Sequence, residues 1–376
     1  MSDAQTIGVM HVVDSLDIGG TETVAVNLAN RLPRDRYRTY LCSTRRSGAL
    51  APSLAEDVGH LRLERRSRMD FTAAAKLRDF VSRENIRLIH VHATSLFFAR
   101  LCTLLPFRKR VRVVWHDHYG LCEQNDRSAP LYRLATKGVA GVIAVNHRLA
   151  DWARDQLHVP PQRVWYVPNF VNPSQGDDAT SGELPGVAGS RIVCVANLRP
   201  QKDHLTLIRA MERVCRERPD AHLLVVGLPI DRQYESRLRA ETASLGLDRN
   251  ITFLGQVCGV GPVLRSCDVG VLSSASEGLP LSLLEYGWAG LPTVTTKVGQ
   301  CAEVLDQGKA GFLVDPGSHE QLGDALLTFL NSPRLRAQKG RELREFVART
   351  YHPEAILDRV CGIYDFVLND GLVEAL

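Results

Sequence analysis

Short apolar runs alternate with amphipathic segments along most of the chain, which is the pattern of βαβ units. In the first half, this pattern predicts strands over residues 7–13, 37–43, 86–92, 111–116 and 141–145, with a helix over 21–32. In the second half, it predicts strands over 191–196, 222–226, 251–253, 269–272, 292–295 and 311–314, with helices over 203–216 and 281–289. Because these strands are apolar on both faces, we expect parallel sheets covered by helices on each side.

A segment of linker composition separates the two series of elements. Residues 173–190, PSQGDDATSGELPGVAGS, are rich in Gly, Pro, Ser and Asp. The sequence therefore predicts two doubly wound, Rossmann-like α/β domains over 1–172 and 191–350, followed by a final helical segment over 351–376. Ligands of such sheets bind at the carboxyl ends of the strands, so we expect the site in a cleft between the two domains.

Charge is divided unevenly along the 376 residues. The net charge is +4 overall, but residues 1–175 carry +9 and the remainder −5, so the basic half is expected to face an anionic partner. No apolar run approaches the roughly 18–20 residues that span a bilayer, and no secretory signal is visible at the start. Nine cysteines occur without a CxxC pair. These features predict a cytoplasmic protein with reduced, buried thiols.

Two polar loops follow predicted strands and precede helices. In the first, Gly19 and Gly20 would let the backbone approach an anion at a helix start, with Thr21 as the N-cap. In the second, Arg199 and Lys202 are spaced to hold phosphates. A simple capped turn and a solvated loop are the alternative interpretations of these two segments.

The stretch Glu277-Gly278-Leu279-Pro280-Leu281-Ser282-Leu283-Leu284-Glu285 carries the most chemical information. Glu277 lies on the loop before a helix, where ligand groups gather, and Glu285 lies one turn inside an otherwise apolar helix. Carboxylates accept hydrogen bonds from sugar hydroxyls, and the N–H groups of Leu279 and Leu281 would point into the same space. The alternative is a helix cap with a structural ion pair.

Histidines gather at the ends of two strands. His90 and His92 lie on one face of a strand because they are two residues apart, and His116 and His118 end another strand. Two HxH pairs raise the possibility of zinc, but no further ligand with zinc-site spacing accompanies them, so we expect no metal. Among the four, His116 is the functional candidate, since it lies at the carboxyl end of its strand.

The whole chain resembles the retaining GT-B glycosyltransferases of glycosyltransferase family 4, the group 1 nucleotide-sugar transferases. The matching segments are GGTETVAVNLANRL, IHVHATS, VVWHDH, VIAVNHRL, VPNFVN, RPQKDHLTLIRA, FLGQV and SEGLPLSLLEYGWAGLPTV. The E-x7-E signature from Glu277 to Glu285 is the most specific of them. The sequence departs from the usual pattern of this family at two positions. Phe170 stands where a small residue is usual, and Lys202-Asp203 stands where Lys-Gly is usual.

The resemblance implies a fold and a set of roles. Two Rossmann-like domains would face each other, with the last helix crossing back onto the first domain. Glu277 would bind sugar hydroxyls, Glu285 the ribose, and Arg199 and Lys202 the diphosphate of a UDP- or GDP-sugar. The implied catalytic residues are His116, Glu277, Arg199 and Lys202, with His116 beside the transferred sugar. The remaining implied donor-binding residues are Gly19, Gly20, Val257, Gly278, Leu279, Pro280 and Leu281. The reaction would need no metal and no cofactor, because cationic side chains and helix-start amides stabilise the leaving diphosphate.

The acceptor half contains two basic clusters, residues 62–68 and 108–112, and the second follows the apolar stretch FFARLCTLLPF. Cations beside an apolar face are typical of peripheral contact with anionic lipid, so we expect a sugar or lipid-linked acceptor in cell-surface polysaccharide or glycolipid synthesis. A core helix followed by a solvated loop is the alternative.

Three other functions fit parts of the sequence. A nucleotide-sugar epimerase and a pyridoxal-dependent phosphorylase could share the architecture, although no lysine is identifiable for attaching pyridoxal. Nucleic-acid binding through the basic half is disfavoured, because that half has no recognisable module or interleaved aromatic residues.

Overall fold

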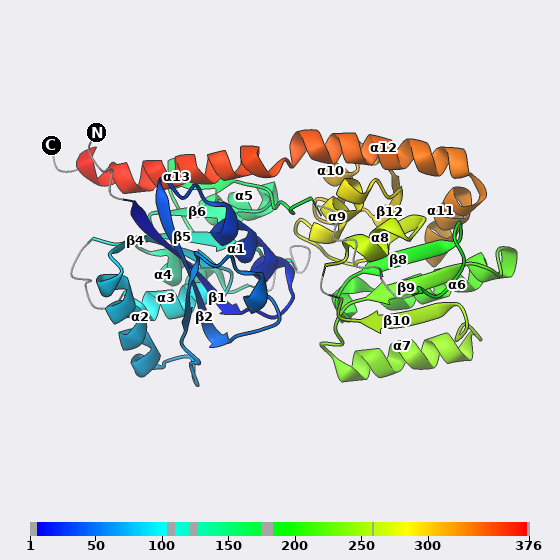
Figure 1. The fold of residues 1–376 in the computed structure, drawn as a ribbon, viewed down its shortest axis with the longest axis horizontal. Coiled ribbons are helices and arrows are strands. Elements are labelled where there is room, and N and C mark those ends of the chain that lie inside the picture. The colour runs from blue at the N-terminus through cyan, green and yellow to red at the C-terminus, as the bar shows by residue number, and fades with distance from the viewer. Residues whose placement is uncertain (1–5, 104–109, 121–126, 174–182, 258, 374–376) are drawn as a thin grey trace. The chain divides into compact units, whose positions relative to one another are not determined.

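The computed structural model describes residues 6–103, 110–120, 127–173, 183–257 and 259–373. Two compact units are formed (Figure 1). Unit 1 comprises residues 1–119, 125–170 and 353–376, and unit 2 comprises residues 120–124 and 171–352. Each unit is described below by itself.

A parallel sheet of seven strands forms the centre of unit 1, in the order β3-β2-β1-β4-β5-β6-β7. The strands are β1 Ile7–Ser15, β2 Tyr37–Arg46, β3 Gly59–Arg62, β4 Ile86–His92, β5 Arg112–Asp117, β6 Gly141–Ala144 and β7 Val164–Tyr166. In β1, the six residues from 8 to 13 are all buried, as expected for a strand covered on both faces. The order changes direction at β1 and β4, so the carboxyl ends of these two strands form the switch point at which α/β sheets bind ligands.

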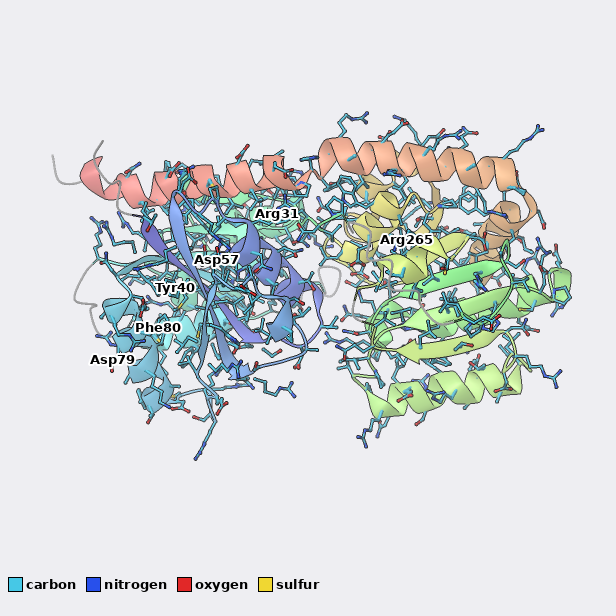
Figure 2. The ribbon with its side chains drawn as sticks, viewed as in Figure 1. Arg31, Tyr40, Asp57, Asp79, Phe80 and Arg265 are labelled. Atoms are coloured by element: carbon cyan, nitrogen blue, oxygen red, sulfur yellow. The ribbon has the colours of Figure 1, made fainter. Side chains whose placement is uncertain are left out.

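Helices complete unit 1. They are α1 Gly20–Arg31, α2 Phe71–Arg83, α3 Ser95–Cys102, α4 Ala129–Thr136, α5 His147–Asp155 and α13 Pro353–Val373, with 3₁₀ turns at Ala51–Ser53 and Pro161–Arg163. Helix α13, the red helix of Figure 1, is the last element of the chain but packs on the first unit. Arg31 of α1, labelled in Figure 2, pairs with Glu354 at the start of α13 at 2.6 Å, and Tyr364 of α13 contacts His90 of β4.

Unit 2 is built on a parallel sheet of six strands in the order β10-β9-β8-β11-β12-β13. Its strands are β8 Arg191–Val195, β9 His222–Val226, β10 Ile251–Gly255, β11 Val269–Leu272, β12 Thr293–Thr296 and β13 Phe312–Val314. Its helices are α6 His204–Glu217, α7 Arg232–Ser244, α8 Gly261–Arg265, α9 Leu281–Ala289, α10 Cys301–Val304, α11 His319–Asn331 and α12 Pro333–Thr350, with 3₁₀ turns at Pro200–Lys202 and Asp306–Gly308. The switch point here lies between β8 and β11, whose following loops carry Arg199 and Glu277.

The predicted fold class, two Rossmann-like α/β domains, is confirmed. The strands predicted over 86–92, 222–226 and 269–272 and the helix over 281–289 have the observed bounds. Strands β3 and β7 were not predicted, because both are short edge strands: β3 (GHLR) has a single large apolar residue, and β7 (VWY) is only three residues long. The prediction of Thr21 as a helix cap is wrong: Gly19 is the N-cap of α1, without a side-chain hydrogen bond, and Thr21 lies in the first turn.

None of the described helices is long and apolar enough to span a bilayer. The seven cysteines within the described ranges are free thiols. The apolar stretch that begins at Phe97 is, in its described part, the helix α3, in which Phe98 is buried and Phe97 packs against Tyr132. Leu104, Leu105 and Phe107, with the basic residues 108 and 109, lie outside the described residues.

Candidate functional site

Lys202 and Glu277 form the centre of the candidate site in unit 2. Lys202 Nζ donates to Glu277 Oε1 at 2.5 Å, and the Ser274 hydroxyl donates to the same oxygen at 2.6 Å. The Glu277 side chain is 5% exposed and that of Lys202 18%. Ser273 donates to the Lys202 carbonyl at 3.0 Å, which ties the two loops together. Two loops from neighbouring strands thus hold one cation and one anion in contact at the switch point.

Helix α9 begins directly after this pair. Gly278 and Leu279 are buried, Pro280 is the N-cap, and the cap position makes no side-chain hydrogen bond. The first-turn N–H groups, starting with Leu281, have no partner within the helix, and the positive end of the helix dipole lies there. The Glu277 loop is therefore followed by a helix start that suits a negatively charged group.

Glu285 lies one turn further along α9. Burial raises the pKa of its carboxyl to about 7, because the charged form loses hydration there. Within the described part of the chain, its carboxylate has neither an ion pair nor a hydrogen bond. An unpaired carboxylate in this position can accept hydrogen bonds from a ligand, and hydroxyl groups are suitable donors.

Arg199 and Asp203 flank Lys202 and differ in their roles. Arg199 is exposed and contacts no carboxylate among the described residues, so the structure pairs only one of the two predicted cations with an acid. Asp203 has φ +46°, the left-handed region that glycine favours, and its side chain accepts a hydrogen bond from the Thr206 N–H at the start of α6. The aspartate in place of the family's usual glycine thus keeps the left-handed turn and adds a helix cap.

Two residues of the loop after β12 support the site but were not predicted. Gly299 has φ +50°, and a Cβ there would lie 2.2 Å from the Glu277 carbonyl oxygen, so only glycine fits. The Gln300 N–H donates to the Gly278 carbonyl at 2.9 Å. The sequence signal was the Gly-Gln pair in the loop after the strand predicted over 292–295, but only the fold shows that this loop packs against Glu277.

The other predicted donor-site residues are spread over both units. Val257 follows β10 in unit 2 and is partly exposed. Gly19 and Gly20 lie in unit 1, as N-cap and first residue of α1, after the switch-point strand β1. Phe170 is 1% exposed, which shows that the larger side chain at this family position fills a core.

Asp14, at the end of β1, is a further candidate residue that the sequence interpretation missed. It accepts hydrogen bonds from Arg65 at 2.7 Å, Thr44 at 2.9 Å and Thr94 at 2.8 Å. The Arg65 guanidinium, with the two hydroxyl groups, outweighs burial and lowers the pKa of Asp14. This network fixes three strand ends beside the Gly19 loop, but only the sheet register brings its members together.

His116 belongs to a cluster of five histidines in unit 1, in which His11, His90, His92 and His116 are buried and His118 is partly buried. The His116 side chain is 2% exposed, and its Nδ1 lies 3.1 Å from Nε2 of His90. Burial lowers the pKa of His116 well below 6.5. The predicted candidate is therefore held inside the strand end as a neutral imidazole, with Nε2 buried and unpartnered among the described residues.

The same cluster was the basis of the rejected zinc interpretation. Nitrogen atoms of His11, His90 and His92, and of His92, His116 and His118, lie within 4.8 Å of one another. The zinc interpretation did not include His11, because a single histidine in a strand forms no recognisable ligand pattern. The register pairs His11 with His90 and His92 with His116, which places the rings side by side on the sheet.

The arrangement in unit 2 can bind a polyhydroxylated anion. Lys202 and the helix start offer positive potential, while Glu277 and Glu285 offer acceptors for hydroxyl groups. Arg199, exposed beside Lys202, adds a second cation.

Two family models match the chain and together cover most of it. The model for "Glycosyl transferases group 1" matches residues 188–346, which include all the candidate residues of unit 2. The model for "Glycosyltransferase Family 4" matches residues 18–175, which include Gly19, Gly20 and His116.

Individual proteins are similar over much of their length. N-acetyl-alpha-D-glucosaminyl L-malate synthase of Bacillus anthracis is 26% identical over 312 residues, 80% of each protein. Phosphatidyl-myo-inositol mannosyltransferase of Mycobacterium leprae is 29% identical over 239 residues, 62% of this chain and 61% of the mannosyltransferase. The crystal structure of Anabaena HepE with UDP and glucose has a TM-score of 0.80, at 18% identity, and covers 96% of this chain and 99% of HepE. That last likeness shows the GT-B fold.

Proposed function

We propose that this chain, which belongs to the group 1 glycosyltransferases of glycosyltransferase family 4, transfers a hexose-type sugar from a nucleotide-diphosphate sugar to an acceptor with retention of configuration. The observation that carries the proposal is the Lys202–Glu277 pair at 2.5 Å before the start of α9. A cation, an acid and helix-start amides together suit a sugar attached to a diphosphate.

Bond cleavage would develop negative charge on the departing diphosphate and positive charge on the sugar ring. Lys202, the exposed Arg199 and the first turn of α9 would stabilise the diphosphate electrostatically. Glu277 would accept hydrogen bonds from sugar hydroxyls and Glu285 from the ribose. The contacts of Glu277 with Lys202 and Ser274 hold its carboxylate in place, so we assign Glu277 to substrate binding and not to covalent attack.

Retention would follow from reaction on one face of the sugar. The acceptor hydroxyl attacks the anomeric carbon as the diphosphate leaves, and a phosphate oxygen takes the acceptor proton. Lys202, Arg199 and the start of α9 would stabilise the negative charge that develops on the departing diphosphate. We therefore propose that UDP- or GDP-sugars react without a metal or another cofactor.

The transfer assay uses a panel of UDP- and GDP-sugars, with products identified by mass spectrometry. Lys202→Ala and Glu277→Gln should each lower turnover about 10²–10³-fold, the usual loss for a preorganised electrostatic group. Lys297→Ala is the matched control, because Lys297 pairs with Asp315 at 3.2 Å in the same unit but on the surface. Wild-type turnover in folded Lys202→Ala or Glu277→Gln protein would contradict the proposed roles. Epimerised donor without transfer would identify an epimerase.

For the acceptor, we propose a lipid-linked sugar at an anionic membrane on the cytoplasmic side. Phosphatidyl-myo-inositol mannosyltransferase, by its name, is a relative that acts on a lipid. Met69 and Phe71 are 64% and 63% exposed and follow the exposed Arg66 and Arg68. Apolar side chains beside cations favour interfacial binding.

Vesicle sedimentation tests the membrane proposal. Wild-type protein should sediment with phosphatidylglycerol vesicles at low salt, and a variant carrying both Met69→Ser and Phe71→Ser should bind several-fold less. Ile230→Ser, which removes an exposed apolar side chain from unit 2, should bind like wild type. Absence of wild-type binding at low salt would overturn the proposal.

A further inference from the structure

A hydrogen-bonded chain connects the last helix of the protein to His116. The Tyr364 hydroxyl of α13 lies 2.6 Å from Nδ1 of His90 on β4, and Nε2 of His90 lies 3.1 Å from Nδ1 of His116 on β5. All three side chains are buried. Three groups from three elements therefore share two hydrogen bonds, and each bond needs one hydrogen and one lone pair.

The phenol at one end gives this chain a direction. Within the described part of the protein, the only hydrogen-bond partner of the Tyr364 hydroxyl is His90. If Tyr364 donates to Nδ1 of His90, then Nε2 of His90 carries the hydrogen that it donates to Nδ1 of His116. The second hydrogen-bonding position of His116, Nε2, then carries its own hydrogen.

The opposite direction is less favourable. It would bury the phenolic hydrogen of Tyr364 without an acceptor and would leave Nε2 of His116 as a bare lone pair. Each arrangement leaves one buried hydrogen without an acceptor, but the opposite one also leaves the buried lone pair of Nε2 of His116 without a donor, so it carries the larger penalty. Burial also keeps His90 and His116 neutral, since it lowers the pKa of both well below 6.5, so each ring carries one hydrogen.

A second chain in the same cluster lacks this direction. Nδ1 of His11 lies 3.1 Å from Nε2 of His92, and Nδ1 of His92 lies 3.1 Å from Nε2 of His118. Its two terminal atoms, Nε2 of His11 and Nδ1 of His118, are both buried without a partner among the described residues. No hydroxyl group fixes either end, so the second chain serves as an internal comparison.

We infer that Tyr364 acts through His90 as a positioning residue that fixes the tautomer of His116, so that Nε2 of His116 presents an N–H donor, and not a base, to an oxygen atom of a sugar substrate. The substrate part of this inference rests on the proposed function. Nε2 of His116 is buried and has no acceptor within the described structure, and it lies near the carboxyl end of β5, the edge where such sheets bind ligands. A substrate oxygen would supply the missing acceptor.

Histidine ring NMR tests the tautomer without any turnover. The protein is labelled with ring-¹⁵N histidine, and the His116 signals are assigned by their loss in His116→Gln. Wild type should show His116 protonated at Nε2. Tyr364→Phe should show both tautomers in comparable amounts, while Tyr37→Phe should match wild type. Tyr37 is the matched control because its hydroxyl lies 3.4 Å from Asp365 of the same helix and its ring packs edge-on against Tyr364.

Kinetics test separately whether Nε2 of His116 acts as a hydrogen-bond donor. The amide nitrogen of glutamine reaches the place of Nε2, whereas that of asparagine reaches only the place of Nδ1. His116→Gln should therefore retain at least tenfold more kcat than His116→Asn, with similar donor KM. An equal, near-complete loss of kcat in both variants would indicate that His116 acts as a base and would overturn its role as a hydrogen-bond donor.

Three further results would overturn the inference. The first is a wild-type His116 protonated at Nδ1, and the second is a Tyr364→Phe protein with an unchanged tautomer. The third is stoichiometric zinc in the purified protein, because an ion held by His92, His116 and His118 would occupy their lone pairs. If no sugar transfer is found with any donor, the proposed function fails, but the tautomer measurement still decides whether Tyr364 sets His116.

Discussion

Glu285 lies in an environment that opposes the charge of its carboxylate. The fold raises the pKa of its carboxyl from 4.5 to about 7, by burial in a helix that is otherwise apolar. Ionisation is therefore more costly in the folded than in the unfolded protein. A carboxylate retained at such a cost is typical of a ligand-binding position, which agrees with the proposed contact to the ribose.

Glu285→Gln should stabilise the free protein in a pH-dependent way. The unfolded carboxyl ionises near pH 4.5 and the folded one near 7, so the wild type loses stability as the pH rises between these values. The variant should gain about 3 kcal/mol over wild type at pH 8 and little at pH 4.5. Urea unfolding at both pH values measures this. A gain that is equal at the two pH values would contradict the account, and the variant should also bind donor more weakly.

Asp117 and Arg127 show how one buried ion pair anchors the chain after β5. Arg127 donates to both carboxylate oxygens of Asp117, at 2.8 and 3.0 Å, and the side chains are 7% and 2% exposed, respectively. The guanidinium also lies 3.7 Å from the ring centre of Trp152 on α5. Burial raises the pKa of Asp117 despite its cationic partner. The pair therefore connects the end of β5, beside His116, to α5.

Asp117→Asn should destabilise the protein strongly, because it leaves the Arg127 charge buried without a counterion. Loss of one partner of such a pair costs about 3–5 kcal/mol. Asp151→Asn breaks the exposed pair with Arg154, which should cost no more than about 1 kcal/mol. Chemical denaturation of both variants gives the comparison. Equal, small losses would show that the buried pair does not anchor this region.

Helices and strands could be predicted from the sequence where a single short segment contains the apolar pattern that defines the element. Strand β4 and helix α9 have the predicted bounds, because apolar runs and helical spacing are local features. Strands β3 and β7 were missed, since edge strands are only partly covered and need fewer apolar residues. The family resemblance assigned Lys202 and Glu277 to one donor site, but it did not predict their direct contact. Asp14, His11 and Tyr364 depend on sheet register and on the packing of α13, which no local pattern encodes.

At the level of the whole chain, sequence order and spatial grouping differ at the end. Helix α12 belongs to unit 2, and α13 packs on unit 1, where Arg36 pairs with Asp365 at 2.7 Å and Arg31 with Glu354 at 2.6 Å. The last helix is thus part of the first domain's structure, and it supplies the hydroxyl group that contacts His90. The chain belongs to the glycosyltransferases, and in it side chains of the last helix, α13, contribute to the core of unit 1.

The central claim is that unit 2 binds the diphosphate of a nucleotide-sugar through Lys202 and the start of α9. Isothermal titration of UDP, GDP and their sugars into wild type, Lys202→Ala and Lys297→Ala measures this directly. The account predicts that one nucleotide class binds wild type and Lys297→Ala equally, and binds Lys202→Ala at least tenfold more weakly. Binding to Lys202→Ala with wild-type affinity, or no binding of any nucleotide to the wild type, would contradict it.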